Sequence, residues 1–148
     1  MTSHREERVV PYTPQQMYDL VADVAAYPAF LPWCVGARVG SSRAVAEGVQ
    51  FDADLVISFK VFRESYRSRV VLRPEVPAID VRNIDGPFRR LTTNYTFHPH
   101  DDGCQMELEI DFEFKSKVLQ SVIGVVFEQA MRKVASAFEN RAAELYGK

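Results

Sequence analysis

Cysteine is scarce in this sequence of 148 residues, which contains only Cys34 and Cys104. Two cysteines so far apart form neither a CxxC pair nor a zinc-ligand spacing, so we expect both thiols to be reduced, buried and inert. The sequence also lacks the run of about 20 apolar residues that a membrane-spanning helix needs. Its first residues lack the apolar core of a signal peptide. We therefore expect a cytoplasmic protein.

An excess of positive charge is also missing. The sequence has 18 basic and 20 acidic residues, which leaves a formal net charge of −2. Bulk electrostatics therefore gives no reason to expect DNA or other nucleic acid as a partner. Hydrophobic residues make up 47% and charged residues 26% of the chain, a composition typical of globular proteins. We predict one domain spanning residues 1–148.

No set of residues has the pattern of a catalytic or metal site. The sequence contains neither a GxGxxG nor a Walker loop. His98 and His100 are metal-ligand types, but a proline separates them in a predicted turn, which favours a solvated turn. The acidic residues between Glu107 and Glu113 recur with the period of a strand and so lie on its wet face. We therefore predict no catalytic residue, no metal and no catalytic cofactor, which favours a binding protein over an enzyme.

Alternating hydrophobicity is the main signal that is present. Apolar and polar residues alternate in several segments, with one face apolar and the other charged, as in an antiparallel sheet that is wet on one side. Thr13 and Pro14 form a helix-starting pair, and the helix that follows should stop before Pro28. The predicted strands are residues 4–10, 35–42, 49–58, 63–72, 78–84, 91–97 and 104–114.

The two central strands carry opposite charges on their outer faces. Asp52 and Asp54 alternate with apolar residues on one strand, and Arg67 and Arg69 do so on the next. Placing Asp54 opposite Arg67 and Asp52 opposite Arg69 pairs these charges across a hairpin. Paired surface charge is the favoured interpretation, and phosphate binding by the arginines is the alternative.

A long amphipathic helix is predicted over residues 117–146. At 1.5 Å per residue it would extend about 45 Å. Its first half, from Val118 to Phe127, is apolar on almost every side and so needs a second apolar partner: protein, a ligand or a membrane surface. Gly124 lies within this half, which suggests close approach or a kink. The helical spacing is carried by Leu119, Ile123, Val126 or Phe127, Ala130, Val134, Phe138, Ala142 and Leu145.

The segment from Ala26 to Cys34, AYPAFLPWC, carries large apolar side chains in a short irregular or helical stretch with two prolines. These side chains either plug one end of the core or form the lip of a cavity. Strands followed by one long helix indicate an α+β fold. We predict a seven-stranded curved antiparallel sheet around the last helix. Because the inner faces carry more aromatic side chains than the helices can cover, we also predict an apolar cavity.

Four segments resemble the START-like coenzyme Q-binding proteins, a family shared with the ribosome association toxin A proteins and grouped with polyketide cyclase-like domains. The segments are LVADVAAYPAFLPWC (residues 20–34), DGPFRRL (85–91), CQMELEIDFEF (104–114) and VFEQAMRKVASAFENRAAELYG (126–147). The block from Asp23 to Cys34 is the most specific. The resemblance implies a helix-grip fold and binding of a polyisoprenoid quinone such as ubiquinone, in support of respiration and without catalysis.

The family supplies no catalytic residues, so the candidate ligand-binding residues come from the apolar pattern. In the family an aromatic residue, often Trp, stands at the position of Tyr95 here. The hydroxyls of Tyr66 and Tyr95 are candidates to bind the ring carbonyls of a quinone. The full set is Phe30, Leu31, Trp33, Phe51, Leu55, Tyr66, Phe88, Tyr95, Leu108, Phe112, Leu119, Val122, Ile123, Val126 and Phe127.

We further predict a partly exposed apolar rim made of Phe30, Leu31, Trp33, Val118, Val122 and Val125. Such a rim would give transient contact with the inner face of a membrane. The resemblance implies respiratory or quinone-biosynthesis enzymes as further partners to be tested. Two other functions stay open: a ribosome-associated, toxin-like protein that blocks subunit association, and a small-molecule cyclase or hydrolase that uses the same cavity.

Overall fold

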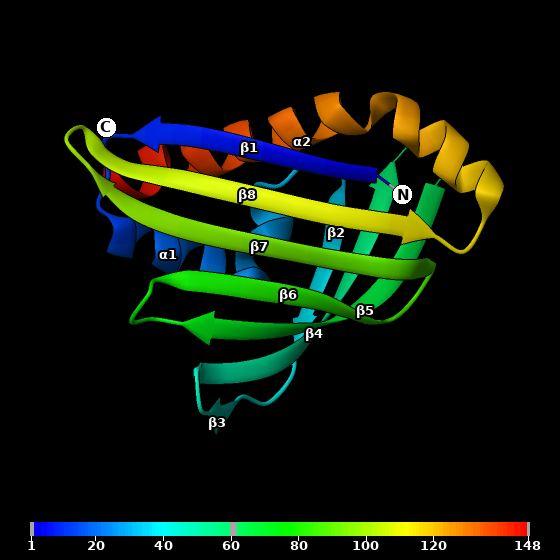
Figure 1. The fold of residues 1–148 in the computed structure, drawn as a ribbon, viewed down its shortest axis with the longest axis horizontal. Coiled ribbons are helices and arrows are strands. Elements are labelled where there is room, and N and C mark those ends of the chain that lie inside the picture. The colour runs from blue at the N-terminus through cyan, green and yellow to red at the C-terminus, as the bar shows by residue number, and fades with distance from the viewer. Residues whose placement is uncertain (1, 60–61, 148) are drawn as a thin grey trace.

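A computed structural model describes residues 2–59 and 62–147 and shows a curved sheet with a long helix lying along it (Figure 1). Apart from the short strand β3, the described residues confirm the predicted order of strands and helices. The elements are β1 (Thr2–Val10), α1 (Pro14–Ala22), the 3-10 helix η1 (Val24–Ala29), β2 (Cys34–Val39), β3 (Arg43–Val45), β4 (Gly48–Phe59), β5 (Phe62–Arg73), β6 (Ala78–Asp85), β7 (Phe88–His100), β8 (Gly103–Phe114) and α2 (Lys117–Tyr146).

Seven strands form the continuous sheet, in the order β1-β8-β7-β6-β5-β4-β2, and each neighbouring pair is antiparallel. The short β3 was not predicted; it pairs with β4 beside the end of β2. Gly86 makes the turn between β6 and β7 at a φ of 145°, and a Cβ there would lie 2.5 Å from the Cβ of Tyr66. Glycine is therefore required at this turn by both conformation and space.

The hairpin of β4 and β5 has the predicted register. Asp54 lies opposite Arg67, Asp52 opposite Arg69, and Leu55 opposite Tyr66 on the inner face. The Nε atom of Arg67 is 2.8 Å from Asp54 Oδ1. Because side chains alternate across a strand, pairing the charges outside places the apolar residues inside.

Helix α1 begins as predicted, with a capping box: the Gln16 backbone N–H donates to the Thr13 hydroxyl, and the Thr13 backbone N–H donates to the Gln16 side-chain oxygen. The helix ends at Ala22, and the next residues form η1, which contains Pro28. The α-helix therefore stops before Pro28 as predicted, and η1 shows that the segment after it is partly helical.

The two halves of α2 are held differently. In the C-terminal half Ala135, Phe138 and Ala142 are buried. Glu139 also forms an ion pair with Arg8 of β1, in which Glu139 Oε1 and an Arg8 guanidinium nitrogen are 2.6 Å apart. In the N-terminal half only Phe127 is buried among the described residues. Thus α2 is fixed to β1, β8 and α1 at one end and stands over the open part of the sheet at the other (Figure 1).

One expectation for α2 was wrong. Leu145 is exposed, because Tyr146 instead turns inward and donates from its hydroxyl to the Gln16 carbonyl at 2.9 Å. Of the two alternatives for Gly124, close approach is absent, since a Cβ at this position would meet no atom within 4 Å, and the kink stays a prediction. No helix in residues 2–59 and 62–147 is both long enough and apolar enough to cross a membrane.

Candidate ligand-binding cavity

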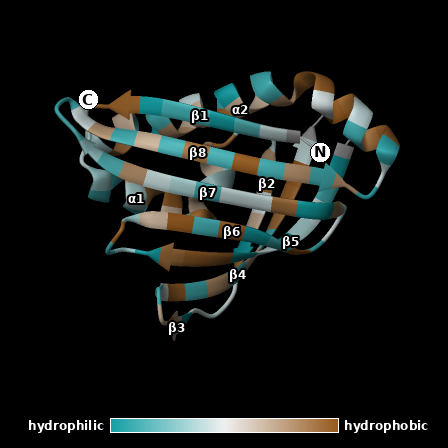
Figure 2. Ribbon diagram, viewed as in Figure 1, coloured by the Kyte–Doolittle hydropathy of each residue, from teal (hydrophilic) through white to brown (hydrophobic). Residues whose placement is uncertain are grey.

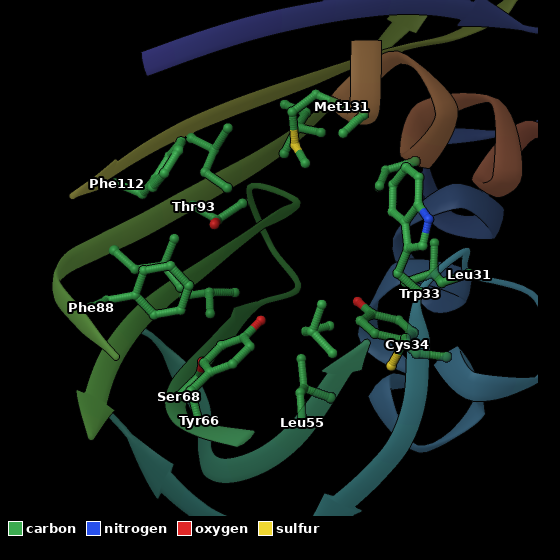
Figure 3. A pocket seen from close by; sticks show the side chains of 18 of the residues that line it. Leu31, Trp33, Cys34, Leu55, Tyr66, Ser68, Phe88, Thr93, Phe112 and Met131 are labelled. Atoms are coloured by element: carbon green, nitrogen blue, oxygen red, sulfur yellow. The ribbon is translucent and has the colours of Figure 1, made fainter. Parts of the chain in front are cut away.

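A cavity of about 230 Å³ lies between the concave face of the sheet and α2. Figure 3 shows its lining side chains surrounding an open space. They come from the inward positions of β4 to β8, from the segment joining η1 to β2, and from α2. The cavity exists because α2 packs on one side of a strongly curved sheet and leaves the sheet centre uncovered.

Most of the predicted site residues meet at this cavity. They reach it from separate elements because strand alternation and the helical repeat direct them to one interior. The predicted residues that line the cavity are Leu31, Trp33, Leu55, Tyr66, Phe88, Tyr95, Leu108, Phe112, Ile123, Val126 and Phe127.

The other four predicted residues lie elsewhere. Phe30 packs against the Phe138 ring at 5.6 Å and lies under the Arg141 guanidinium, so it belongs to the core. Phe51 is buried in the same core. Leu119 packs on a small neighbouring cluster, and Val122 points to solvent.

The sequence reasoning missed several lining residues. Ser68 and Thr93 occupy inward strand positions, so the period-two pattern alone could have nominated them. Ala130, Met131 and Val134 follow from the helical repeat of α2 once the helix is known to border a cavity. The signal that could have identified Ser68 and Thr93 as lining residues is a polar side chain at an inward position of a strand.

The lining is uncharged. Among the described residues, no Asp, Glu, His, Lys or Arg borders the cavity. Burial raises the pKa of Tyr66 and Tyr95, and burial also raises the pKa of the Cys34 thiol, so these groups are neutral at neutral pH. The cavity therefore offers apolar surface and a few neutral hydroxyls, and no acid or base poised to transfer a proton.

Tyr27 differs from the other two tyrosines. Its hydroxyl donates to the Val21 carbonyl at 2.5 Å, which fixes η1 to α1. Burial raises its pKa well above the ordinary value. No such internal bond is formed by the hydroxyls of Tyr66 and Tyr95 within the described chain. Their oxygens are available to a bound molecule, and in Figure 3 the Tyr66 hydroxyl points into the open space.

Trp33 borders the cavity at the start of β2 with an unusual backbone. Its φ is 66°, in the left-handed region that bulky residues rarely adopt. The Ser58 backbone N–H donates to the Trp33 carbonyl at 2.8 Å and so holds this conformation in place. The segment from Leu31 to Cys34 thereby lines the cavity beside α2.

Outside the cavity, the first half of α2 exposes an apolar strip. Val118, Val122 and Val125 are 73%, 54% and 86% exposed, and Figure 2 shows hydrophobic residues at this end of the helix. Lys115 and Lys117 are exposed beside the strip, and no acidic residue occurs from Lys115 to Phe127. Two lysines at a helix N-terminus oppose the helix dipole, which favours acids there. We call these five residues the valine–lysine surface.

The two histidines whose type could bind a metal, His98 and His100, lie at the surface. His98 and His100 are exposed in the last residues of β7, and the turn begins after them. They were expected within the turn itself. The pairing of β7 with β8 extends to His100, which explains the difference.

Comparison with known proteins gives the family. The model of the family "polyketide cyclase / dehydrase and lipid transport" matches residues 10–139. The ribosome association toxin RatA of Rickettsia prowazekii is 36% identical over 148 residues, covering 98% of this chain and 99% of that protein. The mitochondrial coenzyme Q-binding protein COQ10 homolog B of Xenopus laevis is 33% identical over 152 residues, covering 98% of this chain and 59% of that protein.

Solved structures agree with the fold. The 18 kDa protein CC1736 of Caulobacter crescentus, 36% identical, superposes with a TM-score of 0.84 over 100% of both chains. The ZhuI aromatase/cyclase of Streptomyces sp. R1128 has a TM-score of 0.82, covering 95% of this chain and 93% of that one, at 15% identity. The second likeness concerns the fold alone.

Proposed function

The chain belongs to the polyketide cyclase/dehydrase and lipid transport family, and from that premise we propose that it binds a polyisoprenoid quinone such as ubiquinone without catalysing a reaction on it. The observation that carries the proposal is the uncharged, aromatic-rich cavity between the sheet and α2. The similarity to a coenzyme Q-binding protein supports it. The ligand would be held one to one, in support of quinone biosynthesis and respiratory electron transport.

The cavity suits a flat ring with an apolar tail. Phe88 stacks on Phe114 with ring centroids 4.7 Å apart, and the Tyr66 ring lies nearly perpendicular to Phe88 with centroids 5.3 Å apart. Aromatic faces of this kind accept a further ring. Each Å² of apolar surface that the ligand buries contributes about 25 cal/mol. Because pockets for drug-sized ligands measure roughly 300–1,000 Å³, a cavity of about 230 Å³ takes a ring and part of a tail.

The valine–lysine surface supplies a route for the tail. The same helix half presents Ile123, Val126 and Phe127 to the cavity and the valines to the outside. A membrane surface covering the valines would bring lipid next to the cavity wall, and an anionic surface would attract the two lysines. We propose that the protein attaches peripherally to the cytoplasmic face of a membrane, where it would meet respiratory or quinone-biosynthesis enzymes.

Ribosome association is the second candidate function, because a 36% identical relative is named for it. The arginines of the β4–β5 hairpin offer little support, since Arg67 and Arg69 are paired with Asp54 and Asp52. A cyclase activity is supported by the fold of ZhuI, but the uncharged cavity lining supplies no acid or base for it. The quinone proposal accounts for the cavity and for the coenzyme Q-binding relative.

The test is quinone loading. The protein is purified from a host that makes ubiquinone, extracted with solvent and examined by mass spectrometry. We expect quinone with the wild-type protein and less with Leu55→Trp, which fills the cavity; overpacking there can cost about 1–3 kcal/mol, so folding is checked by circular dichroism. Leu145→Trp is the matched control, because Leu145 is exposed away from the cavity.

A folded wild-type protein that neither carries quinone nor takes it up from vesicles would refute the proposal. Sedimentation with ribosomal subunits would then decide for the second candidate. Equal quinone in Leu55→Trp and wild type would show that the ligand binds outside the cavity.

A further inference from the structure

Resting on the proposed function, we infer that the cavity binds its ligand by the oxygen-bearing ring, with the hydroxyls of Ser68 and Thr93 as a hydrogen-bonding anchor in the floor of the sheet. The ligand class is a flat ring with carbonyl or hydroxyl oxygens. The apolar tail then runs from the ring towards α2 and the segment from Leu31 to Trp33.

Ser68 and Thr93 stand apart from the rest of the core. They are 1% and 7% exposed, and they are the buried polar residues of the described chain. Both line the same cavity. Apolar residues fill the neighbouring inward positions, such as Val70 and Val81. Two polar residues among apolar ones, at a single cavity, indicate a ligand with matching polar atoms.

Within residues 2–59 and 62–147, neither hydroxyl has a hydrogen-bond partner from the protein. Ser68 Oγ is buried and has no hydrogen-bond partner. The Thr93 side chain forms no hydrogen bond within the described residues, and in Figure 3 its oxygen points into the open space. A buried hydroxyl without a partner lowers stability, whereas an apolar residue of similar shape does not. A role in ligand binding explains why hydroxyls occupy these positions.

The topology gives the orientation. Ser68 is on β5 and Thr93 is on β7, on either side of the central strand β6. Thr93 pairs with Val81 of β6, which in turn pairs with Val70 of β5, so Thr93 and Ser68 lie in adjacent rows of the sheet centre. α2 packs mainly on β1 and β8 at the sheet edge. The anchor therefore lies at the sheet centre, away from the strands on which α2 mainly packs.

Two further hydroxyls, those of Tyr66 and Tyr95, lie next to the anchor on the same face of the sheet. Tyr66 lies two residues before Ser68 on β5, and Tyr95 lies two residues after Thr93 on β7, so all four share the inner face. Phe88 packs nearly perpendicular to Tyr66 and provides an aromatic surface for the ring. A quinone ring has two carbonyl oxygens on opposite sides, which suits hydroxyl donors on two strands.

The test compares two ligands in a protein first stripped of bound lipid. One is a short-chain ubiquinone, and the other is the same prenyl chain without the ring. For Ser68→Ala and Thr93→Val we expect the affinity for the ubiquinone to fall about three- to tenfold for each hydrogen bond lost. Affinity for the prenyl chain should not change. The melting temperature of the ligand-free variants should stay the same or rise, because an unpaired buried hydroxyl is gone.

The matched controls are Ser65→Ala and Thr92→Val, which carry the same changes on the outer face of the same strands. They should leave both affinities unchanged. Unchanged ubiquinone affinity in Ser68→Ala and Thr93→Val would overturn the anchor while leaving the proposed function intact. An equal loss of both ligands with a lower melting temperature would overturn it too, since that result indicates a structural role. Failure of the wild-type protein to bind either ligand would instead refute the proposed function.

Discussion

Replacing Val122 and Val125 with glutamate should weaken binding to anionic membranes while leaving the fold intact. The two side chains are 54% and 86% exposed, and neither lines the cavity. Surface substitutions of this kind usually change stability by no more than about 0.5 kcal/mol. The double variant therefore separates surface attachment from folding and from ligand binding.

The expected magnitude follows from the exposed area. Full burial of a valine side chain contributes roughly 1.5–3 kcal/mol. Scaled by the exposed fractions, burial of both valines in a membrane surface contributes about 2–4 kcal/mol, and their loss corresponds to a roughly 30- to 1,000-fold weaker partition. The new carboxylates also counter Lys115 and Lys117, each worth about 1 kcal/mol near an anionic surface.

The assay is co-sedimentation with vesicles that contain an anionic phospholipid, compared with vesicles of neutral phospholipid. The matched control is Val9→Glu with Val39→Glu, which adds the same charge at valines that are 48% and 40% exposed on β1 and β2. We expect the control to bind like the wild type apart from a small charge effect. Wild-type binding to anionic vesicles should also fall as salt is raised.

Equal loss in both double variants would refute the assignment of the contact to α2, because charge alone would then explain it. Vesicle binding by neither wild type nor variants would refute membrane contact altogether. Binding of the wild type to ribosomal RNA, abolished in the α2 variant, would assign the same surface to the second candidate function.

Two further predictions concern stability. Phe138→Ala should lower the free energy of unfolding by about 3–5 kcal/mol, because the ring is fully buried and meets Tyr27 at 5.7 Å; urea denaturation measures it, and a loss below 1 kcal/mol would contradict the packing. Asp54→Asn should cost only about 0–1 kcal/mol at neutral pH, since the ion pair with Arg67 is exposed. The hydrogen bond from Arg67 lowers the pKa of Asp54, so the stabilisation is present at neutral pH and is lost as the pH falls through that lowered pKa. The stability difference between wild type and Asp54→Asn should therefore shrink on acidification, and a growing difference would refute this reasoning.

The sheet could be predicted from the sequence because its signals are local. Strict alternation in β8 assigned every inward residue from Cys104 to Phe114, and opposite charges on β4 and β5 set their register. Asp85 and Gly86 marked the turn where only glycine fits. The limits of α2 followed from its apolar repeat, and Ser116 and Gly147 cap it. Each of these features depends on residues that are close in sequence or on a period fixed by backbone geometry.

The cavity itself was decided by tertiary structure. Phe30 and Leu31 are neighbours of similar character, yet Phe30 packs on Phe138 while Leu31 borders the empty space. Val122 and Ile123 differ in the same way, one exposed and the other lining the cavity. The hydrophobic pattern indicates which residues are buried. It does not indicate whether a buried side chain packs against other side chains or borders a cavity. That depends on how far α2 stands from the curved sheet, a distance set by packing between elements far apart in sequence.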